Sequence, residues 1–302
     1  MIFKPWLLRF HRWLSLAFAL PLAIVIVTGL LLSLQPVMQT ASIAPGSLTL
    51  EKAEALLARY DPQGEARSLR LDSFQNQLSI GGVGPEGSIA VDLANGEVAG
   101  ANHWLSELVR ASRGVHEHLI FDLEWLVSAS TVAMLALIAL GVLMGWPRLS
   151  NSVSGWHKGT AWVLLPLLAL SPLTGLFLVA GLTFSAPAPR NPSVPIAQAV
   201  RMIAASHDLS RLEWIRARGG RQIARLDDGY GQRAFIVSDK GLTPAPSNWP
   251  RTFHEGTFWG IWGGIMNLIL SLAFMLLMGT GLLIWARRSL RRRQKRAPAG
   301  AQ

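Results

Sequence analysis

The chain has 302 residues, half of them hydrophobic, and its mean hydropathy is +0.33. This composition indicates an integral membrane protein with substantial polar segments. The net charge is +10, and the absence of cysteine excludes disulfides, iron–sulfur clusters and thiol catalysis.

Four long stretches without a charged residue are each predicted to cross a bilayer as a helix, because each reaches the roughly 20 residues required. They are residues 13–34, 125–146, 159–184 and 256–286. The first is too long for the core of a cleavable signal peptide, and no small-x-small cleavage site follows it. We therefore expect it to remain as a membrane span.

Basic residues are concentrated on one side of the spans. They lie before the first span, between the second and third, and after the fourth. The positive-inside rule then places the N-terminus, the loop 148–158 and the tail 287–302 in the cytoplasm. A charge run directly after a span is better explained as an anchor beside anionic lipid than as a nucleic-acid site.

The two longer segments, 37–120 and 186–253, are predicted to lie outside. The first begins SLTLEKAEALLARYDP and the second PSVPIAQAVRMIAASHD, and both patterns predict an amphipathic helix. Short alternating strands follow in each, and Asn95-Gly96 after one of them indicates a hairpin. Each segment is therefore predicted to be one helix followed by a small antiparallel sheet.

The two halves of the chain resemble each other. FHRWLSL matches GWHKGTAW, and GVHEHLIFDLEWLV matches TFHEGTFWGIWGGI, each ahead of an apolar run. These matches predict two parallel tandem repeats, 1–147 and 148–302. The expected fold is a mainly α-helical membrane protein: a four-transmembrane-helix bundle with two small α+β domains inserted between spans 1 and 2 and spans 3 and 4. The spans, with their flanks, occupy 1–36, 121–147, 159–185 and 254–286.

Four histidines lie at the starts of the four spans: His11, His116, His157 and His254. Repeat symmetry pairs His11 with His157 near the cytoplasmic face and His116 with His254 near the external face. Two imidazoles converging in a helix bundle are the usual axial ligands of a six-coordinate haem. A single histidine at a membrane interface is more often a snorkelling residue, and paired histidines also suit zinc, although two per face form an incomplete set. His118 is a less favoured alternative ligand.

Other polar and aromatic residues have structural interpretations. Thr28-Gly29 and Thr174-Gly175 each follow a histidine by seventeen residues. Their hydroxyls are expected to bond back to a carbonyl one turn earlier and their glycines to let helices pack closely. His103 and His207 are predicted to be surface residues of the inserted segments.

These residues together resemble the PepSY-associated transmembrane proteins over nearly the whole chain. The resemblance rests on the four histidine motifs above and on the strand and turn VDLANGEV; the second segment departs from the pattern in its shorter turn, SDKGL. It implies two PepSY-like domains in the periplasm, 37–120 and 186–253, on a bacterial inner-membrane anchor. It also implies two b-type haems held by His11, His157, His116 and His254, and reduction of a ferric siderophore or another Fe(III) chelate.

Two functions from different classes follow. One is a dihaem oxidoreductase for iron acquisition, in which electrons enter at the His11–His157 haem and leave at the His116–His254 haem. Its electron donor is a quinol or a separate reductase, because no nicotinamide or flavin motif is present. The other is a haem-free, membrane-anchored binding or regulatory protein that acts on an envelope partner such as a peptidase. A transporter is disfavoured because the spans carry no internal acid or base, and no nucleic-acid partner is expected.

Overall fold

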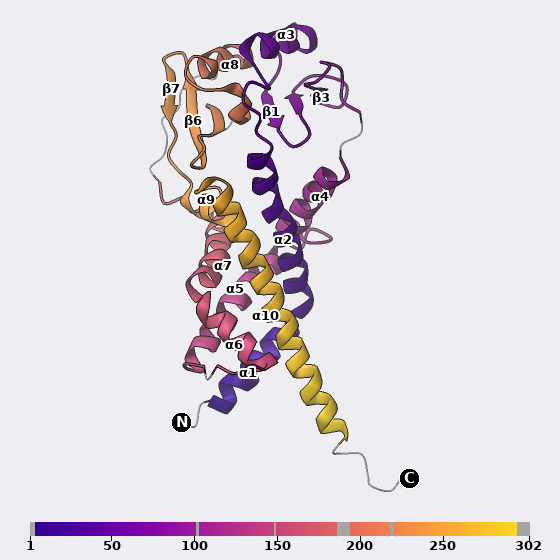
Figure 1. The fold of residues 1–302 in the computed structure, drawn as a ribbon, viewed down its shortest axis with the longest axis vertical. Coiled ribbons are helices and arrows are strands. Elements are labelled where there is room, and N and C mark those ends of the chain that lie inside the picture. The colour runs from indigo at the N-terminus through magenta and orange to yellow at the C-terminus, as the bar shows by residue number, and fades with distance from the viewer. Residues whose placement is uncertain (1–3, 101–102, 148, 186–193, 218–219, 295–302) are drawn as a thin grey trace. The chain divides into compact units, whose positions relative to one another are not determined.

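A computed structural model describes most of the chain and divides it into two compact units (Figure 1). The described residues are 4–100, 103–147, 149–185, 194–217 and 220–294. The helical unit comprises Met1–Leu32, Arg110–Leu182 and Met266–Gln302, and the sheet unit comprises Ser33–Val109 and Thr183–Ile265. The end of the predicted basic tail, 295–302, lies outside the described residues.

Seven helices contribute to the helical unit, three of them shared with the sheet unit along the chain. They are α1 (Lys4–Ala17), α2 (Ala19–Ala41), α4 (Trp104–His118), α5 (Glu124–Leu143), α6 (Val153–Val163), α7 (Leu165–Val179) and α10 (Gly260–Gln294). Among the described residues, three helices are long and apolar enough to cross a membrane: α2, α5 and α10. The pair α6 and α7 adds a fourth candidate span if it is taken as one, although it bends by 68°.

The first and third predicted spans are interrupted at their starts. A single residue, Phe18, separates α1 from α2, and Leu164 separates α6 from α7. Proline explains both positions, because its ring clashes with the carbonyl four residues earlier and it has no N–H to donate. Pro21 and Pro166 lie three and two residues after these breaks. Each of these prolines thus lies just after the point where a short helix ends.

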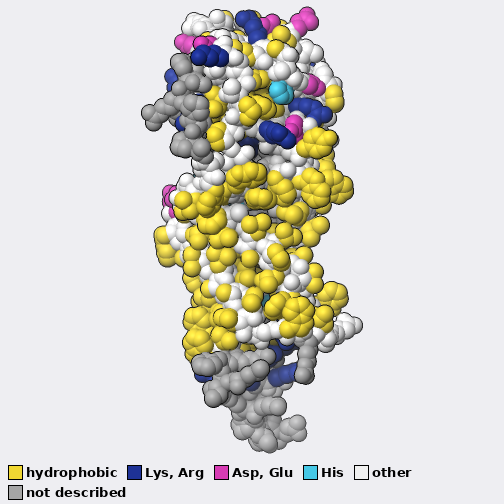
Figure 2. Space-filling view, turned by 90° about the vertical axis from the view of Figure 1, so that its left-hand side faces the viewer, with side chains coloured by type: hydrophobic (Ala, Val, Ile, Leu, Met, Phe, Trp, Pro, Cys, Tyr) yellow, Lys and Arg dark blue, Asp and Glu magenta, His cyan; other side chains and the backbone are white. Residues whose placement is uncertain are grey.

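The surface of the helical unit is apolar. Figure 2 shows hydrophobic side chains covering much of the surface that its helices present to the viewer. Large exposed side chains include Leu20, Val132, Val163 and Leu272, whereas the buried cluster between helices is small, formed around Leu168, Leu270 and Ala273. A surface of this size and polarity would be unfavourable in water and suits contact with lipid.

The sheet unit contains one antiparallel sheet of seven strands in the order β3-β2-β1-β4-β5-β6-β7. The strands are β1 (Ser68–Asp72), β2 (Gln77–Gly81), β3 (Ser88–Asp92), β4 (Leu212–Ala217), β5 (Gln222–Asp227), β6 (Gln232–Ser238) and β7 (Gly241–Pro244). The first inserted segment supplies three strands and the second supplies four. The expectation of two separate small sheets is therefore corrected: β1 pairs with β4, with Leu69 opposite Ile215. Pairing covers two edges that would otherwise expose unbonded backbone groups.

Two helices cover one face of this sheet. They are α3 (Leu50–Tyr60), capped by the Thr49 side chain, and α8 (Ile196–Ala204). Their apolar residues join alternate residues of the strands in a single core, including Leu56, Leu69 and Ile215. The remaining elements of the unit are a 3-10 turn, Leu209–Arg211, and α9 (Trp249–Glu255). The predicted amphipathic helices are confirmed, and they share one core.

Candidate functional site

The four predicted ligands each lie on a short helix that precedes a longer one. His11 is on α1, His116 on α4, His157 on α6 and His254 on α9. Local sequence explains where these helices begin and end. Ser152 caps α6 and Asn248 caps α9 through side-chain bonds to backbone N–H groups, and Gly256 ends α9 in the left-handed conformation.

His116 contacts the span α2 at Thr28 and Gly29. Its Nδ1 atom lies 3.0 Å from the Thr28 hydroxyl, which in turn lies 2.7 Å from the carbonyl of Ile24. Gly29 provides room for the ring, because a Cβ atom there would lie 3.3 Å from His116 Cε1. The predicted back-bond of Thr28 is therefore confirmed, and the same hydroxyl also meets a predicted ligand.

His157 has the same environment on α10. Its Nδ1 atom lies 2.9 Å from the Thr280 hydroxyl, and that hydroxyl lies 2.6 Å from the carbonyl of Leu276. A Cβ atom at Gly281 would lie 3.5 Å from His157 Cε1. Two histidines from different parts of the chain are thus each placed against a Thr-Gly pair of a membrane span.

The structure brings His11 close to His157. The imidazole of His11 acts electrostatically on that of His157. Nδ1 of His11 is buried, and among the described residues it finds no hydrogen-bond partner. A buried imidazole nitrogen without a partner costs free energy, which a proton acceptor or a metal at the ring would recover. The pairing of His11 with His157 stays a prediction.

The second predicted pair lies across the two units, since His116 belongs to the helical unit and His254 to the sheet unit. This pairing stays a prediction. His118 faces elsewhere: its Nδ1 lies 2.6 Å from a Glu124 carboxylate oxygen, and its side chain is 46% exposed. Because its side chain is almost half exposed, His118 remains the less favoured alternative ligand.

Two further histidines make structural contacts. His103 is exposed, accepts a bond from the backbone N–H of Leu105 at the start of α4, and packs edge-on against Phe74. His207 is half-buried and packs against Phe235. Neither contact brings another titratable side chain close, which agrees with their interpretation as surface residues.

The histidine set fits haem better than zinc. Within the described ranges no group of three or more histidine, aspartate or glutamate side chains is arranged to hold a metal ion. Structural and catalytic zinc sites need three or four such ligands. Haem needs only two axial imidazoles beside apolar walls and small residues. The buried Nδ1 of His11 and the small residues Gly29 and Gly281, each of which lies against a histidine ring, are compatible with those needs.

The sheet face opposite α3 and α8 carries arginines around a tryptophan. Trp214 pairs across the strands with Arg70 on one side and Arg225 on the other, so all three project from the same face. The guanidinium carbons of Arg216 and Arg225 lie 4.0 and 5.2 Å from the Trp214 ring centre. Such a face presents positive charge beside an aromatic surface.

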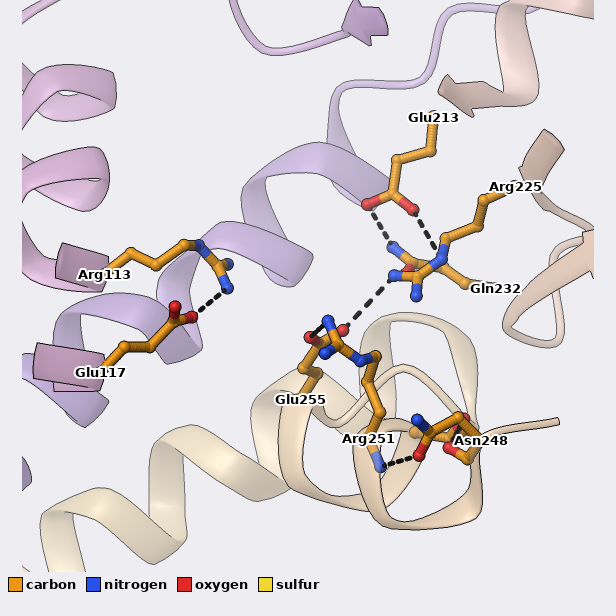
Figure 3. A network of polar contacts seen from close by, with 9 residues as sticks. Arg113, Glu117, Glu213, Arg225, Gln232, Asn248, Arg251 and Glu255 are labelled. Carbon is orange, nitrogen blue, oxygen red and sulfur yellow. Dashed lines mark hydrogen bonds and ion pairs between the residues drawn. The ribbon is translucent and has the colours of Figure 1, made fainter. Parts of the chain in front are cut away.

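Carboxylates partly neutralise this face (Figure 3). Arg225 lies between Glu213 and Glu255, with nitrogen–oxygen distances of 3.6 and 3.3 Å, and Arg251 also contacts Glu255 at 3.3 Å. Burial raises the pKa of the Glu213 carboxyl, although the neighbouring Arg225 acts in the opposite direction. The network fixes Arg225 and joins α9 to the sheet.

The sequence did not predict the residues that His116 and His157 contact. Thr28-Gly29 was assigned to helix packing, and Thr280-Gly281 was not singled out, although both dipeptides lie in apolar spans. Thr174, in the third such dipeptide, makes the predicted back-bonds to the Leu170 and Ser171 carbonyls. The threefold recurrence of Thr-Gly was the available signal.

Comparisons with known proteins place the chain in a family. No curated protein matches the sequence. The family model described as the PepSY-associated TM region matches residues 8–288. Because this match covers nearly the whole chain, including all four span-associated histidines, the protein belongs to the PepSY-associated transmembrane family.

Proposed function

We propose that this protein is a membrane-embedded dihaem b oxidoreductase that reduces a ferric siderophore or another Fe(III) chelate in the periplasm. His11 and His157 would hold one haem and His116 and His254 the other. Bound haem supplies reversible one-electron transfer. The electron donor is a quinol or a separate reductase.

One observation carries the proposal: two of the four histidines are oriented by matching Thr-Gly pairs within the membrane spans. Buried histidines that ligate metals usually donate their second ring N–H to an acceptor, which fixes the tautomer. An interfacial histidine that only snorkels to water needs no such partner. The closeness of His11 to His157 adds support for a ligand pair.

The two halves also place their first histidines alike, which supports tandem repeats. Each short helix breaks seven residues after its histidine, at Phe18 and at Leu164 (18 − 11 and 164 − 157). We infer a parallel arrangement of the repeats, with both chain ends in the cytoplasm and the sheet unit in the periplasm.

The arginine and tryptophan face is our candidate surface for the chelate. Arg70, Arg216 and Arg225 would attract an anionic ferric complex, and Trp214 offers a flat surface for its organic part. The overall reaction adds one electron to Fe(III) and gives Fe(II), whose weaker binding to oxygen ligands favours release.

The test is an optical spectrum of the full-length protein, purified from cells supplied with haem. We expect a Soret band and reduced b-type bands from two haems per chain. His11→Ala and His157→Ala should remove one centre, and His116→Ala and His254→Ala the other, while His103→Ala leaves both.

Absence of these bands from folded wild-type protein would overturn the proposal and favour the haem-free binding or regulatory function. Loss of both haems from all four folded variants would instead refute the pairing. If haem binds, ferric chelates added to the reduced protein should reoxidise it, and a chelate-independent rate would contradict the assigned substrate class.

A further inference from the structure

Two of the Thr-Gly pairs, Thr28-Gly29 and Thr280-Gly281, are assigned a more specific role than helix packing. This assignment rests on the proposed function. We propose that Thr28 and Thr280 are positioning residues, which fix the tautomer and ring orientation of His116 and His157 so that Nε2 of each is the ligand atom. The consequence is that two threonines in the membrane spans tune the two centres separately.

The positions of the hydroxyl hydrogens follow from the distances. Oγ1 of Thr28 lies 2.7 Å from the Ile24 carbonyl oxygen, and Oγ1 of Thr280 lies 2.6 Å from that of Leu276. Two oxygens this close are held together only by a hydrogen between them, and a carbonyl cannot supply it. Each hydroxyl therefore donates to its own helix.

A hydroxyl has one hydrogen, so towards the histidine each threonine can only accept. The contacts of 3.0 and 2.9 Å then require a hydrogen on Nδ1 of His116 and of His157. In a neutral imidazole the other nitrogen carries the lone pair. Nε2, the atom farther along the ring, is thereby the one prepared for iron.

The glycine after each threonine completes the arrangement. In both places the ring carbon between the two nitrogens, Cε1, lies over the glycine. A Cβ atom would lie 3.3 Å from Cε1 of His116 if added at Gly29, and 3.5 Å from Cε1 of His157 if added at Gly281. The threonine sets the hydrogen bond, and the absent side chain lets the ring approach the helix closely enough to form it.

His11 is not oriented by a Thr-Gly pair of this kind. In the described part of the chain its Nδ1 has no hydrogen-bond partner. The two ligands of the first proposed pair are therefore unequal: His157 is oriented by a threonine hydroxyl, whereas His11 makes a hydrogen bond to the backbone of Leu137. Removing a hydrogen-bond acceptor from a ligand histidine makes it a poorer donor to ferric iron, so the reduction potential should rise.

The experiment compares Thr28→Val and Thr280→Val with Thr28→Ser and Thr280→Ser in the full-length protein. Valine keeps the shape and removes the acceptor, whereas serine keeps the hydroxyl. Thr131→Val is the matched control, because Thr131 makes the same back-bond, 2.9 Å to the Val127 carbonyl. Haem content, potentials and low-spin ferric electron paramagnetic resonance spectra are measured for each.

We expect each valine variant to weaken haem retention at one centre by about 10- to 100-fold. A tenfold preferential loss for the ferric state would raise the potential of that centre by about 59 mV. The serine variants and Thr131→Val should stay close to wild type. Valine variants with wild-type spectra and potentials would overturn the positioning role while leaving haem binding intact; haem-free wild-type protein would instead overturn the proposed function.

A second measurement covers valine variants that do not fold. In haem-free wild-type protein labelled with ¹⁵N-histidine, the imidazole nitrogen shifts report which nitrogen is protonated. We expect the Nδ1–H tautomer at His116 and at His157, assigned by His116→Gln and His157→Gln. The Nε2–H tautomer at either histidine would refute the inference for that site.

Discussion

One hydroxyl that donates to its own helix and accepts from a neighbouring ring explains the placement of two histidines. Thr28 and Thr280 are ordinary residues of apolar helices when viewed along the sequence, because threonine often bonds back to the preceding turn. Their second contact depends on which helix lies beside them. The histidines could be predicted from their recurrence, whereas their partners required the packing of α4 on α2 and of α6 on α10.

Glu213 provides a prediction about pH in the sheet unit. Burial raises the pKa of its carboxyl, so it retains its proton in the fold at pH values where the unfolded chain has lost it. Its contribution to stability is complete below the ordinary glutamate pKa, about 4.3, and is lost as the pH rises through the raised value. Glu213→Gln should therefore weaken the fall in thermal midpoint between about pH 4 and about pH 8.

The control for that measurement is Glu97→Gln. Glu97 is 60% exposed and pairs with Arg59 at 2.9 Å, and surface ion pairs contribute only about 0–1 kcal/mol. Thermal unfolding of both variants is followed in detergent over the same pH range. A wild-type slope in Glu213→Gln would show that burial does not control this carboxyl.

Short helices ahead of long ones recur throughout the fold, and each carries one of the four histidines. A short helix can present its side chains at an angle that the following span cannot. Hydropathy predicted the long helices α2, α5 and α10 well, because a run of about 20 apolar residues is typical of a transmembrane helix. It extended the first and third spans without a break, since Phe18 and Leu164 are as apolar as their neighbours.

Pro166 is the residue that should maintain the bend between α6 and α7. We expect Pro166→Ala to let the helix continue through Leu164, because alanine restores an N–H and removes the ring clash. Spin labels can be placed at Trp156 and Val179 after mutation to cysteine, since the chain has no native cysteine. Their separation should rise towards about 35 Å, the length of 23 residues (179 − 156) of continuous helix.

Straightening should also move His157 away from Thr280, so haem retention at that centre should fall in parallel. Val163→Ala is the control, because it alters an exposed side chain at the same bend without changing a backbone donor. An unchanged label separation in Pro166→Ala would mean that packing, and not proline, sets the 68° angle.

Strands from both inserted segments form one sheet, and neither segment forms this sheet alone. The first helix and the short strands of each segment were predicted, since those patterns are local. The structure adds a second helix that was not predicted, α4 in the first segment and α9 at the end of the second. The union of the two segments through β1 and β4 was not predictable from local pattern, because strands separated by more than a hundred residues pair according to edge geometry and a shared core. In two separate sheets each of these strands could lie at an edge, whereas here both are interior strands.

A single sheet predicts that the two segments unfold together. Leu69 and Ile215 face each other across β1 and β4, and both side chains are 0% exposed. Leu69→Ala should therefore destabilise the sheet unit by about 2–5 kcal/mol, the cost of a cavity in a packed core. Hydrogen exchange should then accelerate equally in β2 and in β5, although the substitution lies in only one segment. Val98→Ala, at a side chain that is 60% exposed, should accelerate neither strand. Faster exchange in the first segment alone would contradict a shared core and would indicate two independent domains. Equal acceleration in both segments is expected because the apolar residues of their strands are buried in one cluster.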